Sequence, residues 1–153
     1  MTTPTITEKI KSLGDQLGAV YTRPNPERLA HYQLMLMGND TAMQYLSQAR
    51  NLTVDTIKHF GLGFDTDKQA IAIPVYKKGE LINIKYRFLN PTSAKYIGER
   101  NAEVWLYNDE GIEEAKKKGG VLIVEGEFDC MSAWQAGIKN VVSPASGKDS
   151  YGM

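Results

Sequence analysis

The sequence contains very little cysteine, no excess charge of either sign and no long apolar run. Its single cysteine, Cys130, permits no disulfide within the chain and no cysteine-based structural zinc site. We therefore expect Cys130 to pack as a small apolar side chain and the protein to work in a reduced, cytoplasmic setting. No apolar run approaches the roughly 18 residues that span a bilayer, and the N-terminus lacks a signal-peptide pattern.

The charges of the chain balance, with 18 lysines and arginines against 18 aspartates and glutamates. Proteins that hold nucleic acid mainly by charge are commonly basic, so this balance argues against a purely electrostatic DNA binder. It still allows local basic stripes. The length of 153 residues fits one domain or two small lobes, enough to bury a real core.

The first 60 residues are predicted to be helical. Apolar residues recur at spacings of three and four, which places them on one face of each helix. The predicted helices cover residues 6–17, residues 26 or 27 to 37, residues 41–50 with Asp40 as N-cap, and residues 54–60 with Thr53 as N-cap.

From Gly61 the pattern changes to that of strands, and residues 61–118 are predicted to form a β-rich lobe. Residues 70–76 predict a strand with an edge or bulge at Pro74, and residues 77–80 predict a hairpin turn. In residues 81–88 the alternation places Ile82, Ile84, Tyr86 and Phe88 on one face and Asn83, Lys85 and Arg87 on the other. Residues 95–97 predict a short strand, residues 104–107 a junction, and residues 109–118 a charged helix with a solvated lysine end.

Residues 119–143 predict a strand, a helix and a second strand. Residues 121–124 form a short apolar run, which is typical of a buried strand in a parallel sheet. Gly126 permits a sharp turn into a helix, and Ala136 with Gly137 ends it before a strand at residues 138–143. Glu125 then stands at the carboxyl end of the first strand, where open α/β sheets place their ligands.

Three stretches, in this order, resemble the DNA primases of the bacterial and phage TOPRIM type. The first is Tyr45-Leu46 with Arg50-Asn51-Leu52, Ile57 and Phe60-Gly61-Leu62-Gly63-Phe64. The second is Ile73-Pro74-Val75, a glycine turn, Tyr86-Arg87-Phe88 and Lys95-Tyr96-Ile97. The third is Val124-Glu125-Gly126 with Asp129, which resembles the opening of a TOPRIM domain.

The resemblance implies an α+β to α/β fold in three parts. A helical segment (1–60) and the β-rich basic lobe of a primase core (61–118) would precede the start of a TOPRIM domain (119–153). The activity implied is Mg²⁺-dependent synthesis of RNA primers on single-stranded DNA, with Mn²⁺ as a possible substitute. The implied partners are the DNA template, ribonucleotides and a replicative helicase, fused or separate, in a bacterial or phage-infected cell.

The carboxylates of the third stretch are the candidate catalytic and metal-binding residues. Nucleotidyl transfer needs charge neutralised on phosphate and on the attacking and leaving oxygens, and Mg²⁺ takes carboxylate ligands. The resemblance implies that Glu125 and Asp129 hold the metal, or that Glu125 acts as a general base or acid. Alternatively, Asp129 only favours the helix N-terminus electrostatically. Glu127 is expected to be a solvated acid at the helix start.

A run of cations without an intervening acid, between Glu80 and Glu99, supplies candidate phosphate contacts. Tyr86, Phe88 and Tyr96 interleave with them, and aromatic rings can stack unpaired bases. The alternative is that these rings are core residues and the cations are simply exposed. The candidate nucleic-acid- or nucleotide-binding residues are Arg87, Lys95, Lys85, Arg50, Arg100 and Lys148.

The sequence departs from the primase pattern in two places. It has no cysteines for the usual N-terminal zinc module, so no zinc is expected, and it reaches Met153 before the Asp-x-Asp pair of a TOPRIM domain. We therefore expect a front fragment of a primase, inactive alone. The alternatives are a non-catalytic module that binds single-stranded DNA or docks on a replisome, and a piece of a TOPRIM nuclease or topoisomerase.

Overall fold

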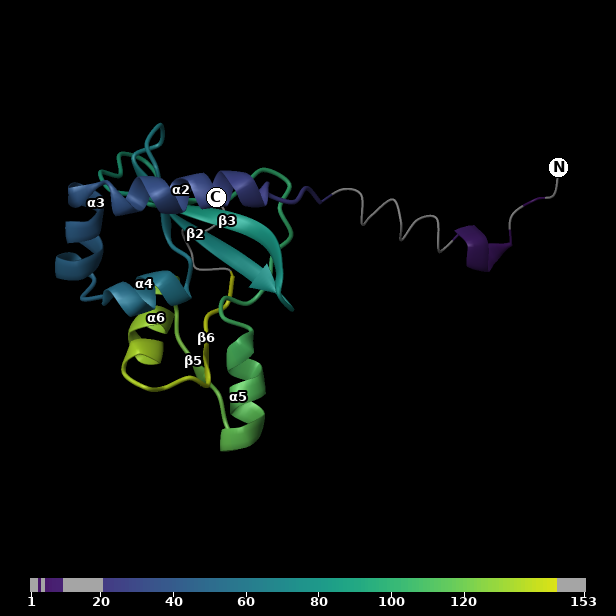
Figure 1. The fold of residues 1–153 in the computed structure, drawn as a ribbon. Coiled ribbons are helices and arrows are strands. Elements are labelled where there is room, and N and C mark those ends of the chain that lie inside the picture. The colour runs from purple at the N-terminus through teal and green to yellow at the C-terminus, as the bar shows by residue number, and fades with distance from the viewer. Residues whose placement is uncertain (1–2, 4, 10–20, 146–153) are drawn as a thin grey trace.

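The computed structural model describes residues 3, 5–9 and 21–145 (Figure 1). Of the helix predicted over residues 6–17, residues 6–9 are helical and the remainder lies outside the described residues, as does Lys148. The described chain combines helices with a four-stranded antiparallel sheet and a two-stranded parallel sheet. The mixed α and β architecture expected from the sequence is therefore confirmed.

The helices before the sheet begin at side-chain caps. Helix α2 (Pro26–Met37) starts with proline at its first position, and the side chain of Asn25 accepts a hydrogen bond from the Glu27 amide. Helix α4 (Val54–His59) is capped by Thr53, as predicted. Helix α3 (Asp40–Gln44) is capped by Asn39, so the prediction of Asp40 as N-cap was wrong by one residue.

The chain does not continue α3 as a regular α-helix to Arg50. It widens into a π-helical turn, η1 (Tyr45–Ala49), in which the amide of Arg50 donates to the carbonyl of Tyr45. Such turns often accompany functional sites because they re-aim the side chains that follow. Here Tyr45 begins the turn and Arg50 follows it.

The larger sheet has the order β1-β2-β3-β4, with every neighbouring pair antiparallel. Its strands are β1 (Gly63–Asp65), β2 (Ala70–Lys77), β3 (Glu80–Phe88) and β4 (Tyr96–Ile97). Lys78 and Gly79 both have positive φ in the two-residue β2–β3 hairpin, as a type I′ turn requires. Strand β1 pairs only with Ala70–Ala72, so Pro74 sits where β2 has no partner on that side.

A register shift in the hairpin alters the predicted faces of β3. Val75 pairs with Asn83 and Tyr76 pairs with Leu81, which leaves Ile82 as an extra residue. Ile84 and Tyr86 therefore share one face, as predicted, and this face packs under α2, while Ile82 joins the cluster on the opposite face. The prediction that Ile82 shares their face was wrong because the bulge interrupts the alternation.

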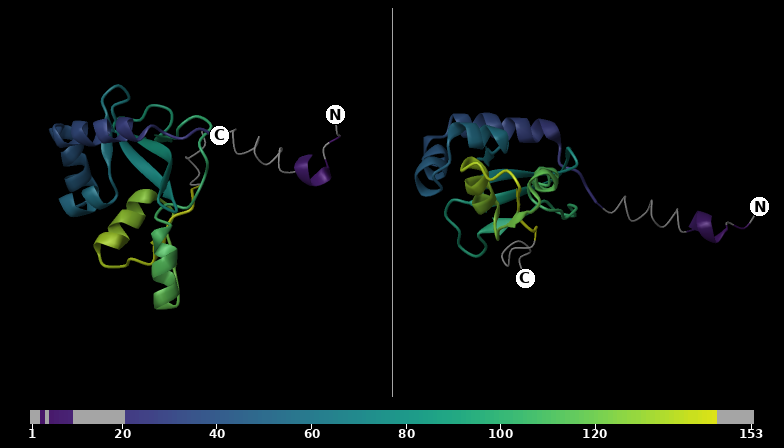
Figure 2. Two further views of the ribbon diagram at one scale, coloured as in Figure 1. Left: turned by 45° about the vertical axis from the view of Figure 1, so that its right-hand side comes forward. Right: turned by 90° about the horizontal axis from the view of Figure 1, so that it is seen from below.

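Both faces of the sheet are covered. Helix α2 lies along one face, where Leu29 and Tyr32 pack on Ala72 and Tyr86 (Figures 1 and 2). The larger hydrophobic cluster lies on the other face and includes Leu46, Phe64, Ile73, Phe128 and Met131. The same covered face carries three side chains that pair across the strands with members of this cluster, namely Asn83, Lys85 and Arg87. None of the three therefore lies on an open, solvent-facing side of the sheet.

The C-terminal unit is the predicted strand–helix–strand. Strand β5 (Leu122–Ile123) pairs in parallel with β6 (Val141–Val142), and helix α6 (Glu127–Gln135) connects them. Helix α5 (Glu110–Lys118) precedes β5, and Gly119 ends it in the left-handed conformation. The bridge of Tyr107 to Ser143 joins this unit to the preceding segment, as the predicted junction requires.

Strand β5 is not buried, contrary to prediction. Its neighbour Val121 is 40% exposed and Ile123 is 65% exposed. Within the described residues β5 pairs only with β6, so its other edge and part of its apolar surface face solvent. Among the described helices, none combines the length and apolar character needed to cross a bilayer.

Candidate functional site

Two of the predicted acids stand exposed where β5 leads into α6. Glu125 follows the strand, and Asp129 lies in the first turn of the helix. The carboxylate of Asp129 turns back toward Gly126, because a Cβ built on Gly126 would lie 3.6 Å from its Oδ2. Glu125 and Asp129 therefore lie on either side of one short segment at the helix N-terminus, which favours negative charge.

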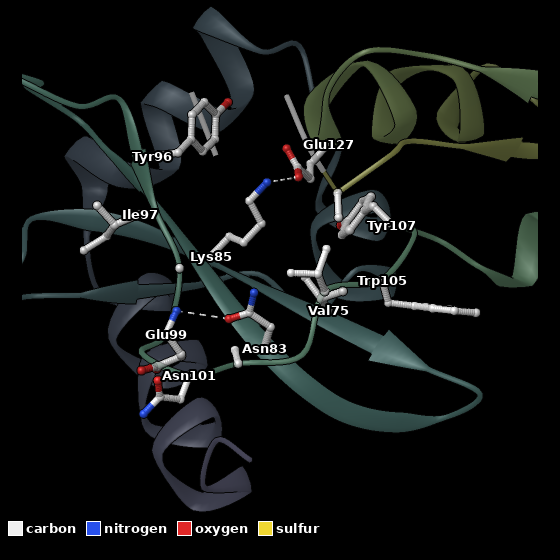
Figure 3. A pocket seen from close by; sticks show the side chains of 14 residues that line it. Val75, Asn83, Lys85, Tyr96, Ile97, Glu99, Asn101, Trp105, Tyr107 and Glu127 are labelled. Atoms are coloured by element: carbon white, nitrogen blue, oxygen red, sulfur yellow. Dashed lines mark hydrogen bonds and ion pairs between the residues drawn. The ribbon is translucent and has the colours of Figure 1, made fainter. Parts of the chain in front are cut away.

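Glu127 is not the solvated acid that we expected. Its side chain is only 6% exposed and forms an ion pair with the ammonium of Lys85, whose side chain is 7% exposed (Figure 3). Lys85 belongs to β3, so this pair joins the larger sheet to the first turn of α6. The helical spacing could have indicated that Glu127 is buried, because position 127 shares a helical face with Cys130 and Met131, which are both fully buried.

Two predicted phosphate-binding arginines lie in one aromatic cluster. The Nε of Arg50 donates to the hydroxyl of Tyr45 at 2.9 Å, and its Cζ lies 4.3 Å from the centre of the Phe128 ring. The Cζ of Arg87 lies 5.9 Å from the ring centre of Tyr45 and 5.5 Å from that of Tyr96. We call these five residues the arginine–aromatic cluster. Such stacking orients a guanidinium group while leaving N–H donors available.

The arginine–aromatic cluster holds its charges partly out of water. Arg50 and Arg87 are both half-buried, and the Nε of Arg87 is buried without an acceptor in the described part of the chain. Burial raises the pKa of the Tyr96 hydroxyl, while the charge of Arg50 lowers it, and the net shift is upward. Tyr96 therefore remains a neutral hydrogen-bond donor at physiological pH.

The other predicted cations lie elsewhere. Lys95 and Arg100 are exposed on the segment around β4 and are not members of the arginine–aromatic cluster. Lys85 is buried against Glu127, and its ammonium also lies 5.6 Å from the ring centre of Tyr96. The structure therefore brings Arg50, Arg87 and Lys85 together around Tyr96, and leaves Lys95 and Arg100 in contact with solvent.

A cavity of about 370 Å³ opens beside this group, between β3, the segment after β4 and the first turn of α6 (Figure 3). Lys85 and Glu127 line its inner end. Asn83 and Glu99 line another side, where the Oδ1 of Asn83 accepts the Glu99 amide at 3.1 Å. Tyr107 also lines it, and its buried hydroxyl has no partner among the described residues. Charged, amide and aromatic groups thus meet in one concave site, typical of a site for a polar organic ligand.

The donor set at the strand end fits a hydrated Mg²⁺ ion. Such an ion is commonly bound through one or two carboxylates and keeps several waters, and Glu125 and Asp129 supply two exposed carboxylates. The described residues contain no group of three or more acidic, histidine or cysteine side chains placed to hold a metal. A closed, all-protein metal cage is therefore not formed by this part of the chain.

Comparisons with curated proteins find plant relatives. The chain is 38% identical over 81 residues to the Primase homolog protein of Arabidopsis thaliana, which covers 53% of this chain and 22% of that protein. It is 36% identical over 81 residues to the Twinkle homolog protein, chloroplastic/mitochondrial, of the same plant, covering 53% and 11% respectively. The chain therefore spans less than a quarter of the length of either relative. No protein-family model matches it.

The fold is that of bacterial primase catalytic cores. The Aquifex aeolicus primase, solved with its zinc-binding and RNA polymerase domains, aligns with a TM-score of 0.70 and 21% identity. The alignment covers 86% of this chain and 41% of that one. The RNA polymerase domain of the Mycobacterium tuberculosis primase DnaG, in complex with a double-stranded DNA oligomer with a 6-nucleotide overhang, aligns with a TM-score of 0.65 and 19% identity, covering 85% and 54%. The resemblance to TOPRIM-type primases is confirmed by both kinds of comparison.

Proposed function

We propose that this chain is the front part of a DNA primase core, which makes RNA primers on single-stranded DNA by metal-dependent nucleotidyl transfer. One observation carries the proposal. The first turn of α6 bears the exposed carboxylate of Asp129 and, at the preceding position, the Phe128 ring that stacks on Arg50. Phosphoryl chemistry needs a metal-binding acid close to a phosphate-binding cation, and this turn brings Asp129 and Arg50 to one place.

The acids have distinct proposed roles. Glu125 and Asp129 would hold the metal, with Glu125 alternatively taking the proton of the attacking 3′-hydroxyl. When bound, a divalent ion would neutralise charge on the α-phosphate and on the attacking and leaving oxygens. Mg²⁺ is the proposed ion, with Mn²⁺ as a substitute, because the donors are hard carboxylate oxygens. No zinc is proposed.

The cations are proposed to bind the template and the nucleotide. Arg50 and Arg87 are preorganised by aromatic rings, so each presents its guanidinium to phosphate with little loss of side-chain entropy. Lys95 and Arg100 are exposed and would add backbone contacts with single-stranded DNA, and Lys148 is proposed for the same role. The Mycobacterium tuberculosis primase domain, which shares this fold, was solved with a DNA oligomer bound, and this supports the assignment.

The partners and setting follow from the same proposal. Single-stranded DNA and ribonucleotides would be the substrates, and a replicative helicase, fused or separate, would be the partner. The Twinkle homolog among the relatives supports the helicase link. A cytoplasmic setting in a bacterial or phage-infected cell remains a prediction from the sequence.

A primer-synthesis assay tests the proposal. The protein that contains this chain, and the chain alone, would receive single-stranded DNA, labelled ribonucleotides and Mg²⁺ or Mn²⁺. Short RNA products that disappear with Glu125→Gln are expected from the longer protein. Products from the 153-residue chain would contradict the expectation that it is inactive alone. Intact DNA binding without products from either form would favour the non-catalytic binding module.

A further inference from the structure

The ion pair between Lys85 and Glu127 is buried on both sides. The two residues are 42 positions apart in the sequence, and each side chain is no more than 7% exposed. Removing two charges from water is costly, so a buried pair commonly adds little to stability compared with apolar residues of similar size. Such a pair instead restricts the geometry strongly, because either charge left alone in the interior is unfavourable.

Helix α6 is held against the N-terminal helices at other points too. The Phe128 ring packs on Tyr45 and Arg50 in its first turn. In its last turn, Gln135 accepts a hydrogen bond from the Thr53 amide and donates one to the Asn51 carbonyl, both at 2.8 Å. The helix is therefore fixed at both ends, and the ion pair adds a charged contact between its first turn and the sheet to the apolar packing of Phe128 and Met131.

We infer that Lys85 and Glu127 are positioning residues for the acids on either side of Glu127. The inference rests on the proposed function. Glu125 and Asp129 are each two positions from Glu127 and are both exposed, so the anchored side chain between them sets where their carboxylates point. Lys85 contributes from the sheet that also carries Arg87. The pair therefore fixes the positions of Glu125 and Asp129 relative to the arginine–aromatic cluster.

A competing role for Glu127 makes the opposite prediction. If Glu127 were itself a metal ligand, Lys85 would compete with the ion, and Lys85→Met would tighten metal binding. If the pair positions Glu125 and Asp129, Lys85→Met weakens metal binding, because Glu127 loses its anchor. Residues that orient metal ligands without touching the ion commonly alter its affinity by about tenfold or more, which sets the expected size.

The experiment is a Mn²⁺ titration of the full 153-residue chain, followed by the loss of the free-ion electron paramagnetic resonance signal. We expect Lys85→Met and Glu127→Gln each to weaken Mn²⁺ binding about tenfold. The exchanged variant, Lys85→Glu with Glu127→Lys, should recover part of the loss. Glu113→Gln, in an exposed ion pair with Lys116 on α5, is the matched control and should bind as the unmodified chain does.

Urea unfolding of the same variants separates folding from positioning. The double variant, Lys85→Met with Glu127→Gln, should shift the urea midpoint by less than the sum of the shifts of the two single variants. The second substitution removes the charge that the first one left without its partner in the pair. Additive shifts, or tighter Mn²⁺ binding by Lys85→Met, would overturn the inference. Unchanged Mn²⁺ binding by Glu125→Gln would instead refute the metal site of the proposed function, whatever the pair does.

Discussion

The guanidinium of Arg50 lies over the ring of Phe128, with its Cζ 4.3 Å from the ring centre. Arg50 follows the π-helical turn η1, and Phe128 lies in the first turn of α6, so the contact joins residues 78 positions apart. The same arginine donates to Tyr45. A cation held by two aromatic residues at a helix start that also carries acids is a fixed electrostatic arrangement, and it need not be assembled when a substrate arrives.

Replacement of Arg50 should weaken binding of single-stranded DNA. We expect Arg50→Lys, which keeps the charge but loses the planar stack on Phe128, to weaken it about threefold, and Arg50→Gln to weaken it further. Removing one phosphate contact also lowers the slope of log affinity against log salt by about 0.7. Fluorescence anisotropy with a labelled oligonucleotide at several salt concentrations measures both quantities.

Lys117 offers a control for the salt experiment. It lies in the exposed last turn of α5, where its side chain is 73% exposed and pairs with Glu114. Lys117→Gln changes the net charge as Arg50→Gln does, but leaves the arginine–aromatic cluster intact. An equal loss of affinity in both variants would show that only net charge matters, and would count against a specific role for Arg50.

Gly111 should not tolerate a side chain. A Cβ at this position of α5 would overlap the backbone of β6, since it would lie 2.9 Å from the carbonyl carbon of Val141. Gly111→Ala therefore forces α5 away from the strand, and we expect a loss of about 2 kcal/mol in the free energy of unfolding. This exceeds the gain of up to about 1 kcal/mol that alanine gives in an open helix.

Gly120 is the matched control, because a Cβ there would meet no atom within 4 Å. Gly120→Ala should change the free energy of unfolding by no more than about 0.5 kcal/mol. Urea unfolding followed by far-ultraviolet circular dichroism measures both variants. Equal stabilities for Gly111→Ala and Gly120→Ala would mean that α5 does not pack on β6 as described.

Local signals in the sequence were sufficient for most of the fold. Pro26 at a helix start, Thr53 as a cap and Lys78-Gly79 in a tight hairpin each act within a few residues, so the sequence alone predicts them. The strand–helix–strand after Gly119 is local in the same sense. The motif that contains Glu125 and Asp129 could be located for that reason, although their roles stay predictions.

Long-range packing set the features that the sequence did not predict. Glu127 was expected to be solvated because its partner, Lys85, is 42 residues away on a strand face that we expected to be open. Ile82 lies on the face opposite to the predicted one because a bulge in the hairpin interrupts the alternation. The composition of β5 predicts a buried strand, but burial depends on neighbouring strands, and the described residues supply one. Pattern alone contains none of this information.

Cys130 should be unreactive in the folded protein and should make folding sensitive to alkali. Burial is the main cause that raises its pKa to about 12, with a smaller contribution from the charge of Glu127. The residue is fully buried, so a thiol reagent at about pH 8 should modify it only after unfolding in urea. Rapid modification of the native protein would contradict its position in the core.

The alkaline effect has a defined direction. Between the ordinary pKa of a thiol, about 8.5, and the folded value of about 12, the unfolded chain has lost a proton that the folded chain keeps. Stability is therefore intact below about pH 8.5 and falls above it, by up to about 1.4 kcal/mol per pH unit from this group. Cys130→Ala should make the decline of the urea midpoint between about pH 9 and 11 less steep. The pKa of Tyr107 is also raised by burial, so its ionisation on unfolding should account for the decline in stability that remains in this variant.

His59 should report the packing of α4 on α6 through the fluorescence of Trp134. The two rings stack with centroids 3.9 Å apart and planes 18° apart. Burial lowers the pKa of His59, and the nearby charge of Lys139 lowers it further, while Glu110 partly opposes both. Protonated imidazole quenches a stacked indole, so fluorescence should fall on acidification with a midpoint below the ordinary histidine value of about 6.5. Since the unfolded chain binds this proton more readily, stability should also fall as the pH drops below about 6.5.

His31 on α2 supplies the control for that titration, because it lies beside Tyr32 and not beside a tryptophan. His59→Gln should abolish the fluorescence transition, and His31→Gln should leave it in place. The ammonium of Lys139 lies 3.2 Å from the centre of the Trp134 ring, so Lys139→Gln should raise the midpoint by removing a like charge from the neighbourhood of His59. A midpoint at or above about 6.5 in the unmodified protein would mean that α4 and α6 separate in solution, and that the last turn of α6 is held to the N-terminal helices less firmly than its contacts imply.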